Sequence, residues 1–108
     1  MAKPVQLRER AAADVDEALD HYLATAATGV AVGFISALER TMASISRNPR
    51  IGSSRFSYEL DIPELRARHL GRFPYVAFYV EYDSHIDVWR ILHGRRDIPA
   101  ALSENPEQ

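Results

Sequence analysis

The residues best suited to chemistry lie close together near the C-terminal end of the chain. Within residues 88–99, His93, Arg95, Arg96 and Asp97 follow an apolar run, with Gly94 as a turn residue among them. Histidine exchanges a proton near neutral pH, and arginine can hold a carboxylate or a phosphate through two hydrogen bonds. This stretch therefore offers either acid–base chemistry or a charged surface that recognises a partner.

An arginine also stands inside the expected strand that leads to this stretch. Alternation places Ile86, Val88, Arg90 and Leu92 on one face, and Asp87, Trp89, Ile91 and His93 on the other. Because an isolated buried charge is very costly, Arg90 must be paired or must reach water. A structural interpretation pairs it with Glu81 or Asp97. A functional interpretation adds it to a cationic site made of His93, Arg95 and Arg68 or Arg72, and the two interpretations are compatible.

Other familiar sites are missing from the sequence. The four histidines, His21, His69, His85 and His93, show none of the close pairings of zinc sites, so we expect no metal and no cofactor. There is no glycine-rich phosphate loop and no Gly-x-Ser-x-Gly or His-Glu-x-x-His motif. Acidic residues also cluster in the first expected helix, and we interpret them as a solvated face: Asp14, Asp16, Glu17 and Asp20.

Two amphipathic helices precede these residues. An apolar stripe with helical spacing predicts a helix over residues 11–27, and a second stripe predicts another that ends at Asn48-Pro49. Thr28-Gly29 is the expected break between them, because glycine accepts the left-handed conformation found at many helix ends. So short a link predicts an antiparallel helical hairpin.

Strands are predicted on both sides of this hairpin. Residues 5–9 alternate apolar and polar residues, and residues 75–82 and 86–92 are rich in β-branched and aromatic residues. Residues 66–71 read as a further strand, separated from the next by Arg72-Phe73-Pro74. Residues 48–64 read as a loop. The expected fold is α+β, in the order β-α-α-β-β-β, with the helical hairpin packed on a small and mainly antiparallel sheet. We expect residues 103–108 to fray.

Length and composition limit the possible functions. A chain of 108 residues is the size of one domain, and it has no cysteine, which fits a cytoplasmic protein. No apolar run is long enough to cross a membrane. The net charge is −2, with a local positive excess in residues 66–96. Because proteins that bind a phosphate backbone usually have a broad basic surface, this composition is a poor match to that class.

Several segments together resemble the RelE/ParE superfamily of toxins from bacterial toxin–antitoxin pairs, and within it the ParE branch. Asp14-Val15 followed by Tyr22 resembles the first-helix pattern, and Leu38-Glu39 leading to residues 48–52 resembles the second helix and its exit loop. Residues 68–80 resemble a strand of the family. Residues 90–98, Arg-Ile-Leu-His-Gly-Arg-Arg-Asp-Ile, are the most specific match to the ParE C-terminal signature.

The resemblance implies the same hairpin-on-sheet fold and an antitoxin encoded beside the toxin. That partner would be ParD-like, with a ribbon-helix-helix part that binds operator DNA and a flexible segment that wraps the toxin. We expect it to contact the hairpin and the sheet at aromatic and apolar residues: Tyr22, Phe34, Leu38, Tyr75 and Tyr79. We expect the target to contact the charged residues of the opening stretch: Arg90, His93, Arg95, Arg96 and Asp97.

The resemblance allows two toxic mechanisms. ParE-like members are similar to inhibitors of DNA gyrase, which make and break no bonds themselves, and RelE-like members are similar to ribonucleases that cut mRNA on the ribosome. RNA cleavage needs a proton acceptor, a proton donor and cations, which His93, Arg68, Arg72 and Arg90 could supply. The chain has one lysine, and residues 103–108 contain no aromatic residue. Both departures favour gyrase as the target, and a non-toxic corepressor is a third interpretation.

Overall fold

The computed structural model describes residues 2–103, and its element order follows the predicted one with two short helices added. The strands are β1 (Val5–Leu7), β2 (Arg66–His69), β3 (Tyr75–Glu81) and β4 (Ile86–His93). The helices are α1 (Glu9–Thr25), α2 (Thr28–Arg47), α3 (Arg55–Leu60) and α4 (Ile98–Ser103), with the 3-10 turn η1 at Pro49–Ile51. The predicted α+β class and the hairpin on a mainly antiparallel sheet are confirmed.

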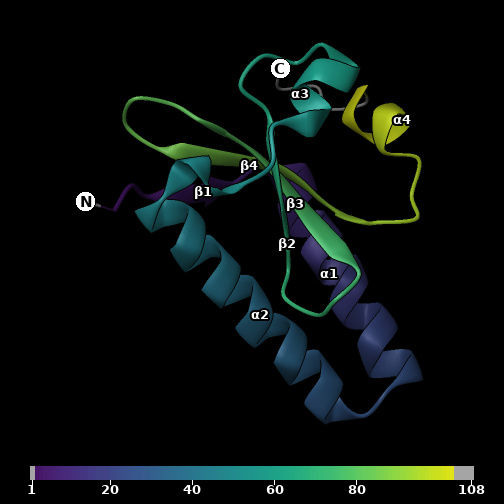
Figure 1. Cartoon of the computed structure of the whole chain (residues 1–108). Helices are drawn as coiled ribbons and strands as arrows, with labels where there is room; N and C mark the ends of the chain where they lie inside the picture. The colour runs from purple at the N-terminus through teal and green to yellow at the C-terminus, as the bar shows by residue number, and fades with distance from the viewer. Residues whose placement is uncertain (1, 104–108) are drawn as a thin grey trace.

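The four strands form one mixed sheet in the order β1-β4-β3-β2. β2, β3 and β4 pair antiparallel as a meander, and β1 returns to pair parallel with β4. Figure 1 shows the hairpin of α1 and α2 on one side of the sheet and the short helices α3 and α4 on the other. Both faces of the two central strands are therefore covered, which explains why β3 is apolar on nearly every residue.

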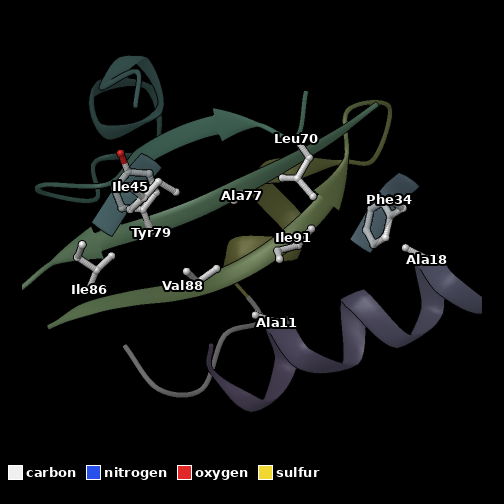
Figure 2. Close-up of a cluster of buried hydrophobic side chains, with 10 residues drawn as sticks. All are labelled: Ala11, Ala18, Phe34, Ile45, Leu70, Ala77, Tyr79, Ile86, Val88 and Ile91. Atoms are coloured by element: carbon white, nitrogen blue, oxygen red, sulfur yellow. The ribbon is translucent and has the colours of Figure 1, made fainter. Parts of the chain in front are cut away.

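Two apolar cores result, one on each face of the sheet. The core beneath the hairpin is shown in Figure 2 and contains Ala11, Ala18, Phe34, Ile45, Leu70, Ala77, Tyr79, Ile86, Val88 and Ile91. The core beneath α3 and α4 contains Leu65, Ala67, Val76, Phe78, Val80, Trp89, Leu92, Ala101 and Leu102. Burial of these side chains supplies most of the driving force for folding.

A β-bulge changes the predicted alternation along β4. Phe78 lies opposite Arg90 and Tyr79 lies opposite Val88, so Trp89 is an extra residue in β4. Val88 and Ile91 consequently face the hairpin, and Trp89 and Leu92 face the opposite core. The prediction that Ile86, Val88, Arg90 and Leu92 share one face is wrong, because it assumed a regular strand.

Two further predictions about local structure are corrected. The link between the long helices is Ala26-Ala27, both with extended backbone, and Gly29 lies in the first turn of α2. The segment predicted as a loop, residues 48–64, contains η1 and α3. Phe56 and Leu60, four residues apart on α3, pack against the second core, and this apolar pair explains why the helix forms there. Of the expected frayed tail, Ser103 ends α4, and residues 104–108 lie outside the described residues.

Candidate functional site

The carboxylate of Asp14 in α1 binds the guanidinium of Arg90 in β4 inside the protein. Arg90 Nε donates to Asp14 Oδ2 and Arg90 Nη2 donates to Asp14 Oδ1, both at 2.8 Å, and the side chains are 1% and 4% exposed. The same carboxylate accepts the backbone N–H of Ile91 at 2.9 Å. Arg90 Nη1 donates to the carbonyl oxygen of Ala101 in α4 at 2.9 Å. This bidentate pair compensates two charges that would be costly to bury alone.

The pairing corrects the sequence prediction for Arg90. Glu81 instead binds Lys3, with Nζ and Oε2 2.7 Å apart. Asp97 Oδ1 accepts the backbone N–H of Ala100 at 3.2 Å, at the start of α4. Arg90 is therefore a structural residue that joins α1, β4 and α4 just before the charged stretch begins.

The charged stretch itself forms an ordered turn between β4 and α4, which we call the corner: His93, Arg95, Arg96 and Asp97. Gly94 N–H donates to the carbonyl of Pro74 at 2.8 Å, and Arg96 N–H donates to the carbonyl of His93 at 3.0 Å. Arg95, Arg96 and Asp97 are exposed, and His93 is half-buried. The backbone of the corner is thus held by hydrogen bonds while its charged side chains remain accessible.

His93 is oriented by two contacts. Its ring lies edge-on to Tyr75, with centroids 5.3 Å apart and an interplanar angle of 75°. Its Nδ1 accepts the backbone N–H of Arg95 at 3.1 Å, so the neutral ring carries its proton on Nε2.

A cavity of about 350 Å³ lies between the corner and α1. His93, Arg96 and Tyr75 form one wall, and Glu17 and His21 form another. Burial raises the pKa of the Tyr75 phenol above its ordinary value, and the charges of Tyr22 and Glu17 add to this effect. Tyr75 is therefore neutral at physiological pH and can donate a hydrogen bond. The cavity offers a partner both donors and acceptors within a small volume.

Comparison with known proteins identifies the family of this chain. A family model described as the ParE toxin of the type II toxin-antitoxin system, parDE, matches residues 5–98, which is most of the chain. The chain belongs to the ParE toxin family. It is a toxin of the type II toxin–antitoxin class, as the resemblance of residues 90–98 implied.

One solved structure gives the same fold. The chain is similar to a chain of the structure entitled "Chromosomal ParDE TA system from P. aeruginosa", with a TM-score of 0.70 and 23% sequence identity. The match covers 85% of this ParE-family chain and 96% of the other. Comparison with curated protein sequences gives no match.

The residues considered for RNA cleavage do not meet in this ParE-family chain. Arg90 is buried against Asp14, and Arg72 is exposed in the turn between β2 and β3. Arg68 lines a cleft between α2 and β2, and His93 lines the cavity beside α1. The four groups therefore share no common cavity in which a phosphate could contact all of them.

The residues expected to contact the antitoxin divide into two groups. Phe34 and Tyr79 are fully buried. Phe34 packs within 6 Å of the rings of Tyr22, Phe73 and Tyr75, at centroid distances of 5.7, 5.5 and 5.4 Å. Tyr22, Leu38 and Tyr75 are half-buried and present part of their surface to solvent. Only these three offer a partner an accessible side chain.

Tyr79 has a structural role that its position on β3 did not reveal. Its hydroxyl donates to the carbonyl of Pro49 at 2.7 Å and accepts the N–H of Gly52 at 2.9 Å, which fastens η1 to the sheet. A Cβ atom added at Gly52 would lie 2.5 Å from that hydroxyl, so glycine is required there. Burial raises the pKa of Tyr79 above its ordinary value.

Asp14 is the residue of the site that sequence reasoning missed, because it was grouped with the solvated acids of the first helix. Asp16, Glu17 and Asp20 do reach solvent, but Asp14 is 5% exposed. A signal was present: Ala11, Asp14 and Ala18 are spaced three and four residues apart, and all three are buried. An acidic residue in an otherwise apolar stripe indicates a buried ion pair. Among residues 2–103, no cluster of histidines and acids is suited to a metal ion.

Proposed function

We propose that this toxin inhibits DNA gyrase without making or breaking bonds, and that it contacts gyrase through the corner. Membership of the ParE family carries the proposal. The geometry supports it, because His93, Arg95, Arg96 and Asp97 stand on a turn whose backbone is hydrogen-bonded on both sides. A rigid charged surface loses little conformational entropy when it binds a protein partner.

The position of Arg90 reduces the number of residues that can contact the target directly. Its guanidinium is 1% exposed and is bound to Asp14, so it acts on the target only through the position of the corner. The exposed arginines Arg95 and Arg96 and the half-buried His93 remain for direct contact. Arginine is enriched among the residues that carry most of the binding energy at protein interfaces.

The ribonuclease alternative receives less support. General acid–base cleavage needs His93 and cations around the same phosphate. Arg68 and His93 line different cavities, and Arg90 is engaged by a buried carboxylate. For this alternative, primer extension on translated message would show new ends that disappear in His93→Ala.

We further propose that a cognate ParD-like antitoxin neutralises the toxin by folding a flexible segment onto the hairpin and the adjacent sheet. Tyr22, Leu38 and Tyr75 form the accessible part of this surface. Operator DNA would be contacted through the ribbon-helix-helix part of the antitoxin. A segment that folds on binding can cover a large area.

No helix within residues 2–103 is long and apolar enough to span a membrane.

The test is gyrase-catalysed supercoiling of relaxed plasmid with the purified toxin. We expect a dose-dependent loss of supercoiled product, and its restoration when the antitoxin is added in equimolar amount. Arg95→Ala/Arg96→Ala is expected to need at least tenfold more toxin for the same inhibition, which corresponds to about 1.4 kcal/mol. Full supercoiling at toxin excess, together with normal growth of cells that express the toxin alone, would contradict the proposal.

A further inference from the structure

The fold separates the charges of this protein in a way that its net charge of −2 conceals. Residues 40–58 and 65–80 contain seven arginines and no aspartate or glutamate. All fifteen acidic residues and the six remaining basic residues belong to the rest of the chain. The arginines are Arg40, Arg47, Arg50, Arg55, Arg66, Arg68 and Arg72. Of these, Arg55 is paired with Glu59 at 3.0 Å on α3, so it is not part of the separated charge.

These two segments lie side by side in the structure. Ser53 and Ala67 form an antiparallel bridge, with N···O distances of 2.8 and 2.9 Å. Arg66 Nη1 donates to the carbonyl of Gly52 at 2.8 Å. The segment after α2 and the strand β2 are therefore neighbours, and the arginines of α2, η1 and β2 form what we call the arginine face: Arg40, Arg47, Arg50, Arg66 and Arg68. Figure 1 shows the backbone elements that carry them.

The arginine face contains an open cleft of about 630 Å³ between α2 and β2. Arg40 lines it from α2 and Arg68 lines it from β2, and the hydroxyl-bearing residues Ser44 and Ser53 line it as well. No carboxylate lines the cleft within the described part of the chain, and neither Arg40 nor Arg68 has an ion-pair partner among residues 2–103. Two unpaired guanidinium groups and nearby hydroxyls form a binding site for an anion.

The charge continues beyond this cleft, which distinguishes a polyanion from a single carboxylate or phosphate. Arg47 and Arg50 are exposed at the end of α2 and in η1, and Arg72 is exposed after β2. A nucleic acid presents phosphates at regular, short intervals and can contact several such arginines at once. Local charge of this kind also speeds association with DNA even when the net charge is negative.

We propose that the arginine face binds the phosphate backbone of DNA, with Arg40 and Arg68 as its central contacts. The choice of DNA rests on the proposed function, because gyrase presents DNA to anything that binds it. The toxin would then contact its target complex through two surfaces, the corner on the protein and the arginine face on the DNA. Such a contact carries no sequence preference, because phosphates are the same at every step.

The test is fluorescence anisotropy of a labelled 20-base-pair duplex titrated with purified toxin at several salt concentrations between 50 and 200 mM, without gyrase. We expect binding that weakens steeply with salt. In Arg40→Ala/Arg68→Ala, the slope of log affinity against log salt should fall in magnitude by about 2, one for each lost phosphate contact. Arg95→Ala/Arg96→Ala removes the same charge from the corner and should leave that slope unchanged.

Three results would overturn the inference. The first is the absence of an anisotropy change with the wild-type toxin at 50 mM salt. The second is an equal loss of slope in the two double variants, which would indicate net charge alone. The third is stronger displacement of the labelled duplex by poly-L-glutamate than by unlabelled duplex at an equal concentration of charge, which would assign the cleft to an acidic polypeptide. Thermal unfolding of both variants checks that the fold is retained.

Supercoiling with the same variants separates this inference from the proposed function. If Arg40→Ala/Arg68→Ala loses DNA binding and inhibits gyrase as the wild type does, the arginine face is supported as a DNA-binding surface, and its proposed part in contacting the gyrase–DNA complex is overturned. If the wild type binds DNA with the expected salt slope and does not inhibit gyrase, the arginine face is supported and the proposed function fails. Reduced inhibition that is further weakened by salt supports both.

Discussion

The carboxylate of Asp14 and the guanidinium of Arg90 meet through two hydrogen bonds of 2.8 Å at the point where α1, β4 and α4 converge. Arg90 also holds the carbonyl of Ala101, so a single side chain connects both faces of the sheet. The corner begins three residues after Arg90. Its geometry therefore depends on a contact between residues that are 76 positions apart in the chain.

Replacement of Asp14 tests this dependence. Asp14→Asn keeps the shape of the side chain and leaves the charge of Arg90 buried without its partner. We expect the free energy of unfolding to fall by about 3–5 kcal/mol, as measured by urea denaturation. Asp16→Asn, on the exposed side of the same helix, should change it by no more than about 0.5 kcal/mol. Equal effects of the two substitutions would mean that the ion pair contributes little to the fold.

Tyr79 provides a second test through its hydroxyl and its raised pKa. Tyr79→Phe leaves the N–H of Gly52 and the carbonyl of Pro49 without this partner. We therefore expect the free energy of unfolding in urea denaturation to fall by about 1–3 kcal/mol. Tyr58→Phe is the matched control, because Tyr58 is 84% exposed.

The same variant predicts a pH dependence. Because burial raises the pKa of Tyr79 above the ordinary value of 10, the unfolded chain releases this proton before the folded chain does as the pH rises. The contribution of Tyr79 is thus complete below pH 10 and is lost as the pH rises through the folded pKa. Urea denaturation between pH 8 and pH 11 should show a smaller alkaline loss of stability in Tyr79→Phe than in the wild type. Identical alkaline slopes would argue against burial as the cause.

The antitoxin surface is tested most simply at Leu38. Leu38 is half-buried on α2, so part of its apolar side chain is exposed to solvent. Leu38→Glu places a charge at this position. We therefore expect the cognate antitoxin to bind at least tenfold more weakly in titration calorimetry. Tyr58→Glu introduces the same charge on α3, across the sheet from the hairpin, and should leave the affinity unchanged. If Leu38→Glu binds as the wild type does, the antitoxin does not use this part of the hairpin.

The sequence was sufficient for the features of the fold that depend on local periodicity. The stripes of α1 and α2 and the apolar run of β3 recur over many residues, and each element was found within a few residues of its ends. α3 was missed because it has six residues and its apolar character rests on Phe56 and Leu60 alone. The bulge at Trp89 was missed because it arises from the pairing of β3 with β4, and the sequence of neither strand alone reveals it.

The same holds for the site: features formed by neighbours in the chain were predicted, and features formed by distant segments were not. The corner was found because His93, Arg95, Arg96 and Asp97 are neighbours in the chain. The partner of Arg90 was not found, because its position in a strand suggested only Glu81 and Asp97, and Asp14 lies 76 positions away in the chain. The arginine face was hidden because Arg40 and Arg68 approach each other only when β2 takes the edge of the sheet beside α2. The amino-acid composition alone had argued against a surface that binds a phosphate backbone.

The corner is the surface proposed to poison gyrase, and a DNA cleavage assay tests this most directly. Gyrase, plasmid and toxin are incubated, and protein is then denatured and digested so that any stabilised double-strand break appears as linear DNA. We predict linear DNA with the wild-type toxin, and at least tenfold less with Arg95→Ala/Arg96→Ala at the same toxin concentration. Equal amounts of linear DNA from both proteins, or none from the wild type at excess, would contradict the account.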